Sequence, residues 1–584
     1  MPDYNLIREH KSSTGEAFRK MLVFMKGEKR NLIIAFVVML LNSGIALLIP
    51  YLIGYTIDHY IVTKIYSGLL KYCVILLLIY IASSYTEYLQ TILMGSIGQR
   101  MLFNLRNAIF NKIQSLPVAF FNQNKAGDLI SRVNSDTQTV NQFFSQYLMQ
   151  FVDSIFMMAV AAGIMLSIQP NLGGAGLLPA VAILIFARII NPWVRKKNAI
   201  SLKQYGLLSG EIQEGLSNFT TILAFGRRDF MRSRFEKVNK ENYKTSVISG
   251  LVNNLYAPVF TFFSNIAQLI LLAYGIYLIT QGNFTVGLLI SYIAYAQSFY
   301  RPLRQIATLW ASFQTTMAAW DRISIILNLE SDLEYGKDGQ NVPNGKSLLQ
   351  FKDVTFSYPN GKIVLDKINI ELEKGKTYAF VGPTGGGKTT TASLIARLYD
   401  PNEGSIHLNG ISLKKYSAAE LSKEIGFILQ EPFLFNGTLK DNIIYGNSEF
   451  KGISDNELLE LLKKNGFDTL FQKFDKGLQM KISPDGDGLS LGEKQIIAFI
   501  RAVIRKPKLL ILDEATANID TVTEKQLQEI LDTLPPETTK VIIAHRLNTI
   551  ADADEILFVN ANKIENAGNM EHAMQLLMEH RRTS

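Results

Sequence analysis

A glycine-rich run that ends in lysine and threonine is the clearest chemical feature of this 584-residue sequence. The strand-like Tyr378–Val381 leads into it, and the helical pattern Thr390–Leu398 follows. Glycines at such a turn let successive N–H groups close around the β- and γ-phosphates of a nucleotide, and the positive helix end adds to the attraction. The predicted phosphate site comprises Gly382, Pro383, Thr384, Gly385, Gly386, Gly387, Lys388, Thr389 and Thr390.

Two adjacent acids give a second signal. The apolar run Leu509–Leu512 predicts a buried strand, and Asp513 and Glu514 come directly after it. Because such sheets place their chemistry at the carboxyl ends of strands, we expect Asp513 and Thr389 to hold Mg²⁺ and Glu514 to polarise the attacking water. Two acids after a strand are commonly only a turn, but the phosphate loop elsewhere in the chain favours the catalytic interpretation.

Short strand-like runs alternating with helical segments position these groups. Leu349–Phe356, Thr377–Val381 and Val541–Ile543 are expected strands, so residues 348–584 predict an α/β domain. The segment 330–347, rich in Gly, Asn, Asp and Pro, is the expected linker.

Residues 1–329 have a different texture, that of a helical transmembrane domain. Hydrophobic residues make up 48% of the chain and charged residues 19%. Six apolar stretches supply the roughly 20 residues that a membrane-crossing helix needs. They are Leu32–Tyr51, Leu69–Ser96, Leu148–Ile168, Gly174–Trp193, Leu255–Ile279 and Val286–Trp310. The fold class is therefore a six-span helical domain followed by an α/β ATPase domain.

The distribution of charge gives this domain an orientation. Long basic connections follow the second and fourth spans, and the positive-inside tendency makes them cytoplasmic, together with both chain ends. The net charge of +8 could indicate nucleic-acid binding, but the basic residues lie beside the apolar spans, so no nucleic-acid partner is expected. Ala17–Arg30 is expected to be a helix, either lying on the inner membrane surface or simply leading into the first span.

The remaining composition excludes other site classes. Cys73 is the only cysteine, so the sequence predicts neither a disulfide framework nor a thiolate metal site. Acids at Asp3, Glu9 and Glu16 fit neither a cleaved signal peptide nor a transit peptide, and the first apolar helix is expected to be retained.

Further motifs appear in an order that resembles the ATP-binding cassette (ABC) family, and the resemblance covers nearly the whole chain. By that resemblance, Tyr358 stacks on adenine, Gln430 touches Mg²⁺ and faces the transmembrane domain, and His545 contacts the γ-phosphate. Leu489–Glu493 occupies the place of the family signature, in which Ser490 and Gly492 act on the ATP of a partner chain. Asp520 matches the end of the loop after Glu514.

The resemblance implies a half-transporter of the exporter branch, with the type IV fold. In that family, the phosphate loop of one chain and the signature of another clamp the same ATP, so a dimer has two composite sites. Phe120–Asn122 and Gln213–Phe225 resemble the cytoplasmic connections that press on the nucleotide domains. ATP and Mg²⁺ are the implied cofactors, and the implied cargo is an amphiphile, drug, lipid or peptide carried across the cytoplasmic membrane.

The signature departs from the family pattern Leu-Ser-Gly-Gly-Gln. Leu491 replaces the first glycine and Glu493 the glutamine, so a side chain crowds the γ-phosphate and a carboxylate brings like charge to it. At about 6 Å and an effective dielectric of about 20, that repulsion is roughly 2 to 3 kcal/mol. Because the phosphate-side motifs are intact, the departures favour a heterodimer with one degenerate site over a homodimer.

Alternatives remain for the activity and for the cavity. An importer built on the exporter fold is compatible with the sequence, whereas six spans argue against a soluble ABC ATPase. An ATP-gated channel would be expected to carry a regulatory insertion and a damaged catalytic acid. Within the spans, Glu87 and Asp153 are expected to face a cavity, a partner or the interface, and Arg188 to snorkel. Tyr292, Tyr295, Gln297 and Arg301 either line a translocation path or make helix–helix contacts.

Overall fold

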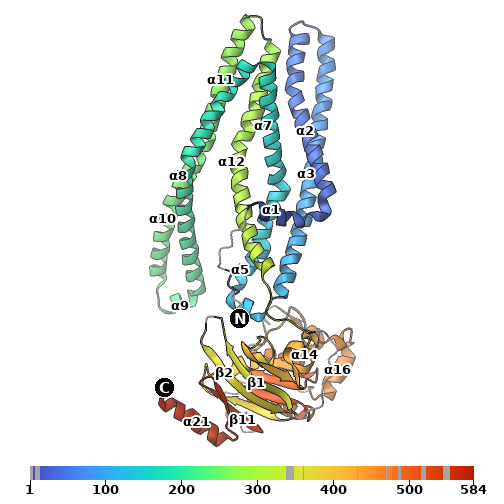
Figure 1. Ribbon diagram of the computed structural model, residues 1–584, viewed down its shortest axis with the longest axis vertical. Coiled ribbons are helices and arrows are strands. Elements are labelled where there is room, and N and C mark those ends of the chain that lie inside the picture. Colours follow the sequence, from blue (N-terminus) through green and yellow to red (C-terminus); the bar gives the residue numbers. More distant parts are fainter. Residues whose placement is uncertain are drawn as a thin grey trace. The chain divides into compact units, whose positions relative to one another are not determined.

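The computed structural model divides the chain into two compact units (Figure 1). The helical unit comprises Glu9–Lys112 and Gly127–Asn328, and the α/β unit comprises Met1–Arg8, Ile113–Ala126 and Leu329–Ser584. The structure describes residues 4–6, 14–336, 347–359, 361–430, 432–467, 471, 474, 477–483, 488–513, 521–543 and 553–583. A segment from the middle of the first half of the sequence, Ile113–Ala126, thus groups with the α/β unit.

The helical unit is built from long helices joined by short turns. Its main helices are α1 (Thr14–Val23), α2 (Lys29–Thr56), α3 (Tyr66–Gln114), α7 (Leu148–Ile168), α8 (Pro170–Ser217), α10 (Arg228–Asn254), α11 (Tyr256–Thr280) and α12 (Val286–Asn328). Between α3 and α7 the chain forms α4 (Val118–Gln123), α5 (Ala126–Ser131) and α6 (Thr137–Gln142), with single π-helical segments before and after α6. The short α9 (Phe219–Ala224) joins α8 to α10.

Five helical stretches in the described residues are long and apolar enough to cross a membrane. They contain the first five predicted spans. The sixth predicted span lies in α12, whose residues 286–303 include Gln297 and Arg301 and several Tyr and Ser side chains, which lower its hydropathy. The count of six spans therefore stays a prediction, with α12 as the sixth helix.

The tyrosines of α12 fasten it to its neighbours. The Tyr292 hydroxyl donates to the carbonyls of Met165 and Gln169, and the Tyr295 hydroxyl donates to the carbonyl of Leu47 at 3.0 Å. Both side chains are buried. Each phenol thus satisfies its own O–H in an apolar setting, and these two residues make helix–helix contacts rather than lining a path.

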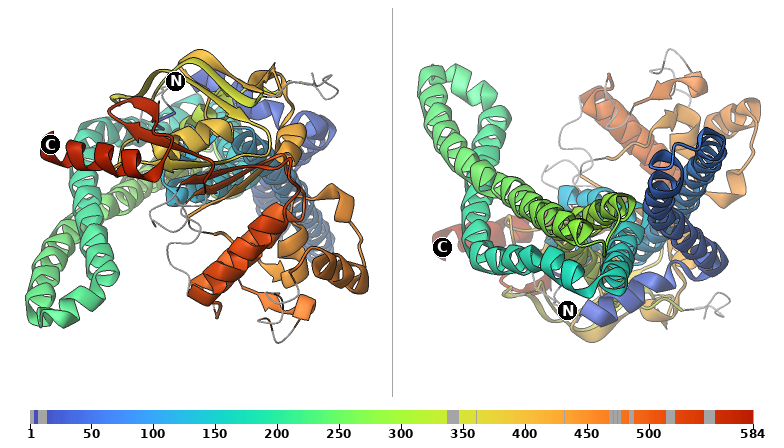
Figure 2. Two further views of the ribbon diagram at one scale, coloured as in Figure 1. Left: turned by 90° about the horizontal axis from the view of Figure 1, so that it is seen from below. Right: turned by 90° about the horizontal axis from the view of Figure 1, so that it is seen from above.

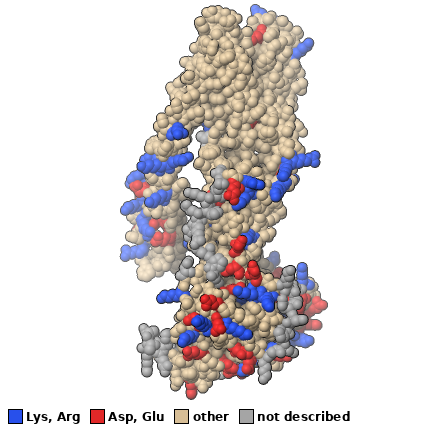
Figure 3. All heavy atoms as spheres, viewed as in Figure 1, with Lys and Arg blue, Asp and Glu red and all other residues tan. Residues whose placement is uncertain are grey.

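A second group of helices extends from this core. α8 packs against α7, α10 and α11, and Figure 2 shows α8, α10 and α11 leading away from the cluster of α2, α3, α7 and α12. Most charged side chains of the helical unit lie on its lower part in Figure 3, and the upper part is largely uncharged. This separation of apolar and charged surface is what a membrane protein requires.

The α/β unit contains two main sheets. The central sheet has the strand order β12-β11-β3-β10-β9-β6, in which β11, β3, β10, β9 and β6 run parallel. Its strands are β3 (Thr377–Val381), β6 (Ile425–Ile428), β9 (Leu509–Asp513), β10 (Thr539–Ile543), β11 (Glu555–Asn560) and β12 (Lys563–Asn566). The second sheet, in the order β2-β1-β4-β5, consists of β1 (Ser347–Ser357), β2 (Ile363–Glu373), β4 (Glu403–Leu408) and β5 (Ile411–Ser412).

Helices cover the central sheet. They are α13 (Lys388–Ile395), α14 (Ala418–Glu424), α15 (Leu439–Ile444), α16 (Asp455–Lys464), α18 (Leu491–Val503), α19 (Thr521–Thr533) and α21 (Met570–Thr583), and β7 (Gly437–Thr438) pairs with β8 (Lys481–Ile482) at the side. Every residue of β9 is buried, as expected of a strand with helices on both faces. The strands predicted at 349–356, 377–381, 509–512 and 541–543 all form, which confirms the α/β domain.

Candidate active site

One edge of the central sheet brings together three parts of the predicted site that the structure describes. The phosphate loop follows β3, Asp513 ends β9, and Gln430 lies two residues beyond β6. Ile428 pairs with Leu512 and Asp513 pairs with Ile543, so the carboxyl ends of these parallel strands are level. Groups from separate parts of the sequence therefore meet where a parallel sheet places its chemistry.

The backbone of the loop requires glycine at its first position. Gly382 has φ +154°, and a Cβ placed there would lie 2.1 Å from the carbonyl oxygen of Val559 on β11. Gly385 has φ +83°, a left-handed conformation that glycine adopts without strain. Only a chain without side chains at these positions can turn this tightly against β11 and lead into α13.

Lys388 is the cation of this loop. Its Nζ donates to the carbonyls of Gly382 at 2.9 Å and Pro383 at 3.0 Å, and the side chain is buried. Binding of a nucleotide would place phosphate oxygens, which are stronger acceptors, beside the same ammonium group. The loop thus holds a positive charge where phosphate charge would accumulate.

Thr389 and Asp513 meet across the site. The Thr389 hydroxyl lies 3.5 Å from Oδ1 of Asp513, although 124 positions separate the two residues in the sequence. A hydroxyl and a buried carboxylate are hard oxygen donors of the kind that Mg²⁺ prefers. The donor set fits Mg²⁺, which would neutralise phosphate charge when bound with ATP.

Tyr358, predicted to stack on adenine, has partners of its own. Its hydroxyl lies 3.1 Å from the Thr390 hydroxyl, and its ring packs edge-on against Phe356 and Tyr399. Tyr358 also lines a cavity of about 300 Å³ together with Asn122 and Tyr399. The stacking role stays a prediction, but the contacts place this ring beside the segment Ile113–Ala126.

The signature forms the N-terminus of α18. Ser490 is its N-cap, and the Glu493 carboxylate accepts hydrogen bonds from the Ser490 N–H at 2.7 Å and the Ser490 hydroxyl at 2.8 Å. The Ser490 Oγ accepts in turn from the Glu493 N–H at 3.2 Å. This capping box is a contact that the electrostatic argument from sequence did not include, and it turns Glu493 back onto its own helix. Leu491 remains exposed at 39%.

Arg501 of α18 ties the signature helix to the segment after Gln430. Its guanidinium donates to the carbonyls of Asn442 at 2.8 Å and Phe433 at 3.0 Å, and it lies over the rings of Phe435 and Tyr445. Burial lowers the pKa of Arg501, although the group stays charged at neutral pH. Sequence reasoning missed this residue, because an arginine within a helix has no distinguishing spacing.

Three predicted residues, Glu514, Asp520 and His545, lie outside the described residues. Glu514 follows Asp513 directly, and His545 comes two positions after the end of β10, the neighbour of β9. Their roles stay predictions.

The segment Ile113–Ala126 makes specific contacts inside the α/β unit. Asn122 donates to the Tyr399 hydroxyl at 2.6 Å, and burial raises the pKa of Tyr399, which therefore stays protonated. Phe120 is fully buried and packs edge-on against Tyr4. The sequence indicated Phe120–Asn122 as a pressing surface but not its partners.

Tyr4 fastens this segment to the chain that follows α12. Its N–H donates to the Gln123 side chain at 2.9 Å, and its carbonyl accepts from Asn124 at 3.0 Å. Its hydroxyl donates to the Asp332 carboxylate at 2.7 Å and accepts from the Asp332 N–H at 3.0 Å. Burial and the Asp332 carboxylate raise the pKa of Tyr4. We call Tyr4 with Gln123, Asn124 and Asp332 the N-terminal clip; nothing in the sequence pattern signalled it.

A polar cavity of about 690 Å³ lies within the helical unit. Glu87, Asp153, Gln297 and Arg301 line it, as the cavity alternative from the sequence expected, whereas Arg188 is not among its lining residues. Sequence reasoning did not single out its neutral polar lining. That lining includes Asn42, Gln90, Thr91, Gln146, Gln150, Ser154, Ser298 and Gln305.

Comparison with known families and proteins gives consistent matches. Residues 32–303 match the family described as ABC transporter transmembrane region, and residues 365–517 match the family described as ABC transporter. The uncharacterized ABC transporter ATP-binding protein YfiC of Bacillus subtilis is 32% identical over 569 residues, which are 97% of this chain and 93% of that protein.

Two further relatives have names that mention a cargo. The fatty acid ABC transporter ATP-binding/permease protein of Mycobacterium bovis is 32% identical over 84% of this chain and 77% of its own length. The ATP-dependent lipid A-core flippase of Syntrophus aciditrophicus is 28% identical over 95% of this chain and 92% of its own. In fold, the chain is similar to a bacterial Atm1-family ABC exporter solved with ATP bound, with a TM-score of 0.78, 23% identity and coverage of 94% of this chain and 96% of that one.

Proposed function

The chain belongs to the ABC transporters, as a fused transmembrane and ATP-binding half-transporter of the exporter type, and from this premise we propose that it exports or flips an amphiphile. Its ATPase is coupled to transport, and it is a multi-pass membrane protein. We also propose that transport runs outward across the cytoplasmic membrane, that both chain termini are cytoplasmic, and that the chain works as a heterodimer.

The observation that carries the proposal is that one chain combines a candidate nucleotide site with a polar cavity among its apolar helices. The sheet edge brings the phosphate loop, Asp513 and Gln430 together, and the helical unit of the same chain encloses a polar cavity among apolar helices. Relatives named for a fatty acid and for lipid A-core support an amphiphilic cargo. An ATPase fused to such a cavity is suited to moving a molecule with a polar head and an apolar tail.

We propose for the site residues the roles that the resemblance to the family implies. Gly382–Lys388 would hold the phosphates, and Thr389, Asp513 and Gln430 would hold Mg²⁺. Glu514 would act as general base toward water, His545 would contact the γ-phosphate and Tyr358 the adenine. Ser490 and Gly492 would act on the ATP of the partner chain.

We further propose a heterodimer in which the other composite site is degenerate. Leu491 stands exposed at the start of α18, and the Glu493 carboxylate occupies the N-terminal cap to which a phosphate of the partner's ATP would bind. A helix N-terminus favours one anion, so the carboxylate and the phosphate compete for it. The phosphate side of the same chain has no comparable departure.

Sealed vesicles test the function. The full-length chain, purified with any partner that accompanies it, is reconstituted and supplied with external ATP, so that only transporters whose nucleotide domains face the outside of the vesicle work. Accumulation or flipping of an amphiphile toward the vesicle interior supports export. ATP-driven loss of preloaded amphiphile from the vesicles would support uptake instead, and the absence of movement in either direction would contradict the proposal.

A further inference from the structure

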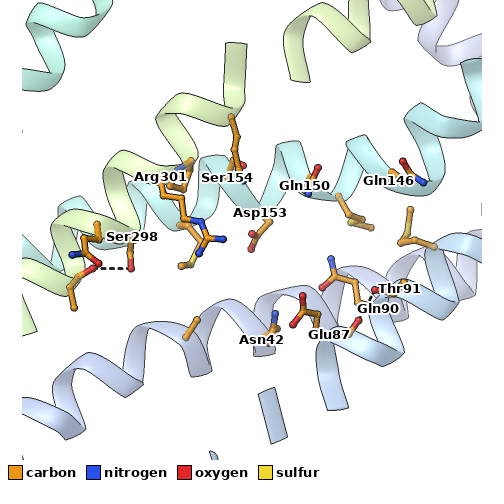
Figure 4. A pocket seen from close by; sticks show the side chains of 18 of the residues that line it. Asn42, Glu87, Gln90, Thr91, Gln146, Gln150, Asp153, Ser154, Ser298 and Arg301 are labelled. Carbon is orange, nitrogen blue, oxygen red and sulfur yellow. Dashed lines mark hydrogen bonds between the residues drawn. The ribbon is translucent and has the colours of Figure 1, made fainter. Parts of the chain in front are cut away.

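The polar cavity of the helical unit carries three ionisable side chains from three helices. Glu87 comes from α3, Asp153 from α7 and Arg301 from α12. Figure 4 shows the three side chains directed into a common space, with Asn42 of α2 and Gln90 of α3 beside Glu87. A cavity lined by charges of both signs differs from the apolar packing that surrounds it.

Glu87, Asp153 and Arg301 form no ion pairs with one another in the described residues. Within the part of the chain that the structure describes, neither Glu87 nor Arg301 forms an ion pair, and Asp153 accepts one hydrogen bond, from the Ser43 hydroxyl at 2.5 Å. Elsewhere in the same unit, charged side chains do pair, as Arg322 does with Asp136. Unpaired charges among membrane helices are costly, and a retained set indicates a ligand that compensates them.

Some of the neutral polar side chains around these charges are already hydrogen bonded within the protein. Asn42 Oδ1 accepts from the Ser83 and Thr86 hydroxyls, both at 3.0 Å, which fixes its amide and directs its NH₂ group away from α3's hydroxyls. Within the described part of the chain, the side chains of Gln90, Gln146 and Gln150, which line the cavity, form no hydrogen bond. These amides can both donate and accept, so they suit a polar head group with several oxygens.

The position of the cavity along the helices restricts what reaches it. Asp153 and Arg301 lie 15 residues from the short-loop ends of their helices, Asn42 lies 19 residues from Ile61, where its helical stretch ends, and Glu87 lies 21 residues from the start of α3. At about 1.5 Å per residue these are about 23 to 32 Å, in a hydrocarbon core about 30 Å thick. The cavity therefore lies in the half of the membrane nearer the long helical extensions, the half from which an exported lipid would be loaded.

We propose that this cavity binds a zwitterionic head group, with an ammonium at Glu87 and Asp153 and a phosphate or carboxylate at Arg301. The inference rests on the proposed transport function and specifies its cargo. Two carboxylates and one guanidinium leave the wall with an excess of negative charge, which disfavours a cargo that carries only an anion, such as a free fatty acid. A volume of about 690 Å³ accommodates a head group of this class with the start of its chains.

Equilibrium binding to the full-length dimer in nanodiscs tests the ligand class separately from transport. Three radiolabelled probes share one acyl chain: lysophosphatidylethanolamine, lysophosphatidylglycerol and the free fatty acid. We expect the ethanolamine lipid to bind about tenfold more tightly than the glycerol lipid, because only its ammonium can pair with Glu87 and Asp153. The fatty acid should bind more weakly still.

Two variants and two matched controls assign the preference to the cavity. Glu87→Gln should abolish the preference for ethanolamine over glycerol, and Arg301→Gln should weaken the binding of both phospholipids. Glu241→Gln and Arg232→Gln remove the same charges on α10, outside the cavity, and should change neither. Equal binding of the three probes, or a preference that persists in Glu87→Gln, would overturn the proposal.

The basal ATPase rate separates this inference from the proposed function. Normal ATP hydrolysis and vesicle transport with no head-group preference would overturn the ligand class alone. Absence of both ATP hydrolysis and transport in the unmutated protein would contradict the transporter assignment, whichever lipid probe binds.

Discussion

The phosphate loop and the N-terminus of α18 both present a helix start to a nucleotide, and they differ in the charge that the chain places there. At the loop, the Lys388 ammonium donates to the carbonyls of Gly382 and Pro383, so a positive charge lies where phosphates would bind. At α18, the Glu493 carboxylate is hydrogen bonded to the Ser490 N–H and hydroxyl, so an anion is already present. This difference supports the proposal that the chain holds its own ATP more firmly than that of its partner.

The hydrogen bonds between Ser490 and Glu493 also affect the energy of ATP binding at the signature. A repulsion of roughly 2 to 3 kcal/mol assumes that the carboxylate faces the phosphate. The capping box adds a second cost, because the Ser490 hydroxyl must leave Glu493 before it donates to a phosphate. Loss of one such cap typically costs about 1 kcal/mol. Both effects would weaken the same composite site.

The largest expected effect comes from the residue after Asp513. Glu514→Gln should reduce ATP turnover by about 100- to 10,000-fold, because Gln keeps the shape but loses the negative charge that polarises water. ATP should still bind, so a closed, outward-facing dimer should accumulate. Spin-label distances across the dimer measure this closure, and their failure to change with ATP would show that binding does not drive switching.

A similarly large loss of ATP hydrolysis is expected when Lys388 of the phosphate loop is removed. Lys388→Ala should lower ATP hydrolysis by about 100- to 1,000-fold, because the charge placed at the phosphates is removed. Lys376→Ala is a suitable control, since Lys376 pairs with Glu373 and Glu555 away from the loop. Turnover like that of the unmutated protein in detergent or nanodiscs would refute the site assignment.

Repair of the signature should have an intermediate effect in the opposite direction. Leu491→Gly with Glu493→Gln should raise the ATPase rate of the chain alone by about tenfold or more, since each 1.4 kcal/mol is a factor of ten in rate. In a heterodimer with an intact partner signature, the same change should alter the rate little. A repaired chain that is no faster alone would leave Leu491 and Glu493 without a physical effect on turnover.

The N-terminal clip should give the smallest effect. Tyr4→Phe removes the hydroxyl that bonds Asp332 at two points, a loss of about 1 to 2 kcal/mol locally. We expect the ATPase rate to change less than the amount transported per ATP hydrolysed, because the clip joins Gln123 and Asn124 to the chain after α12. The control Tyr335→Phe removes an exposed tyrosine hydroxyl. Equal transport per ATP in both variants would show that the clip is only structural.

The sequence predicted the parts of the site that depend on local pattern. The phosphate loop, the strand before Asp513 and the apolar helices are contiguous runs whose residue types determine their structure, and the strand and these helices form as predicted. Tyr292 and Tyr295 could not be assigned from spacing alone, because the same helix face offers either a cavity or a neighbouring carbonyl.

Other features depend on contacts between distant residues, which one sequence does not reveal. The pairing of Tyr4 with Asp332 spans 328 positions, and the bond from Asn122 to Tyr399 spans 277. The capping box at Ser490 is visible in the sequence as Ser followed three residues later by Glu, a signal that the resemblance to the signature obscured.

A mixed dimer tests the central claim, that the chain keeps a sound phosphate side and a weakened signature side. One protomer is unmutated, and the other combines Leu491→Gly and Glu493→Gln with Lys388→Ala; two affinity tags isolate the mixed dimer. Its only sound composite site joins the unmutated Lys388 to the repaired signature. The account predicts ATP hydrolysis about tenfold or more above that of the unmutated homodimer. A mixed dimer no faster than the unmutated one would contradict it.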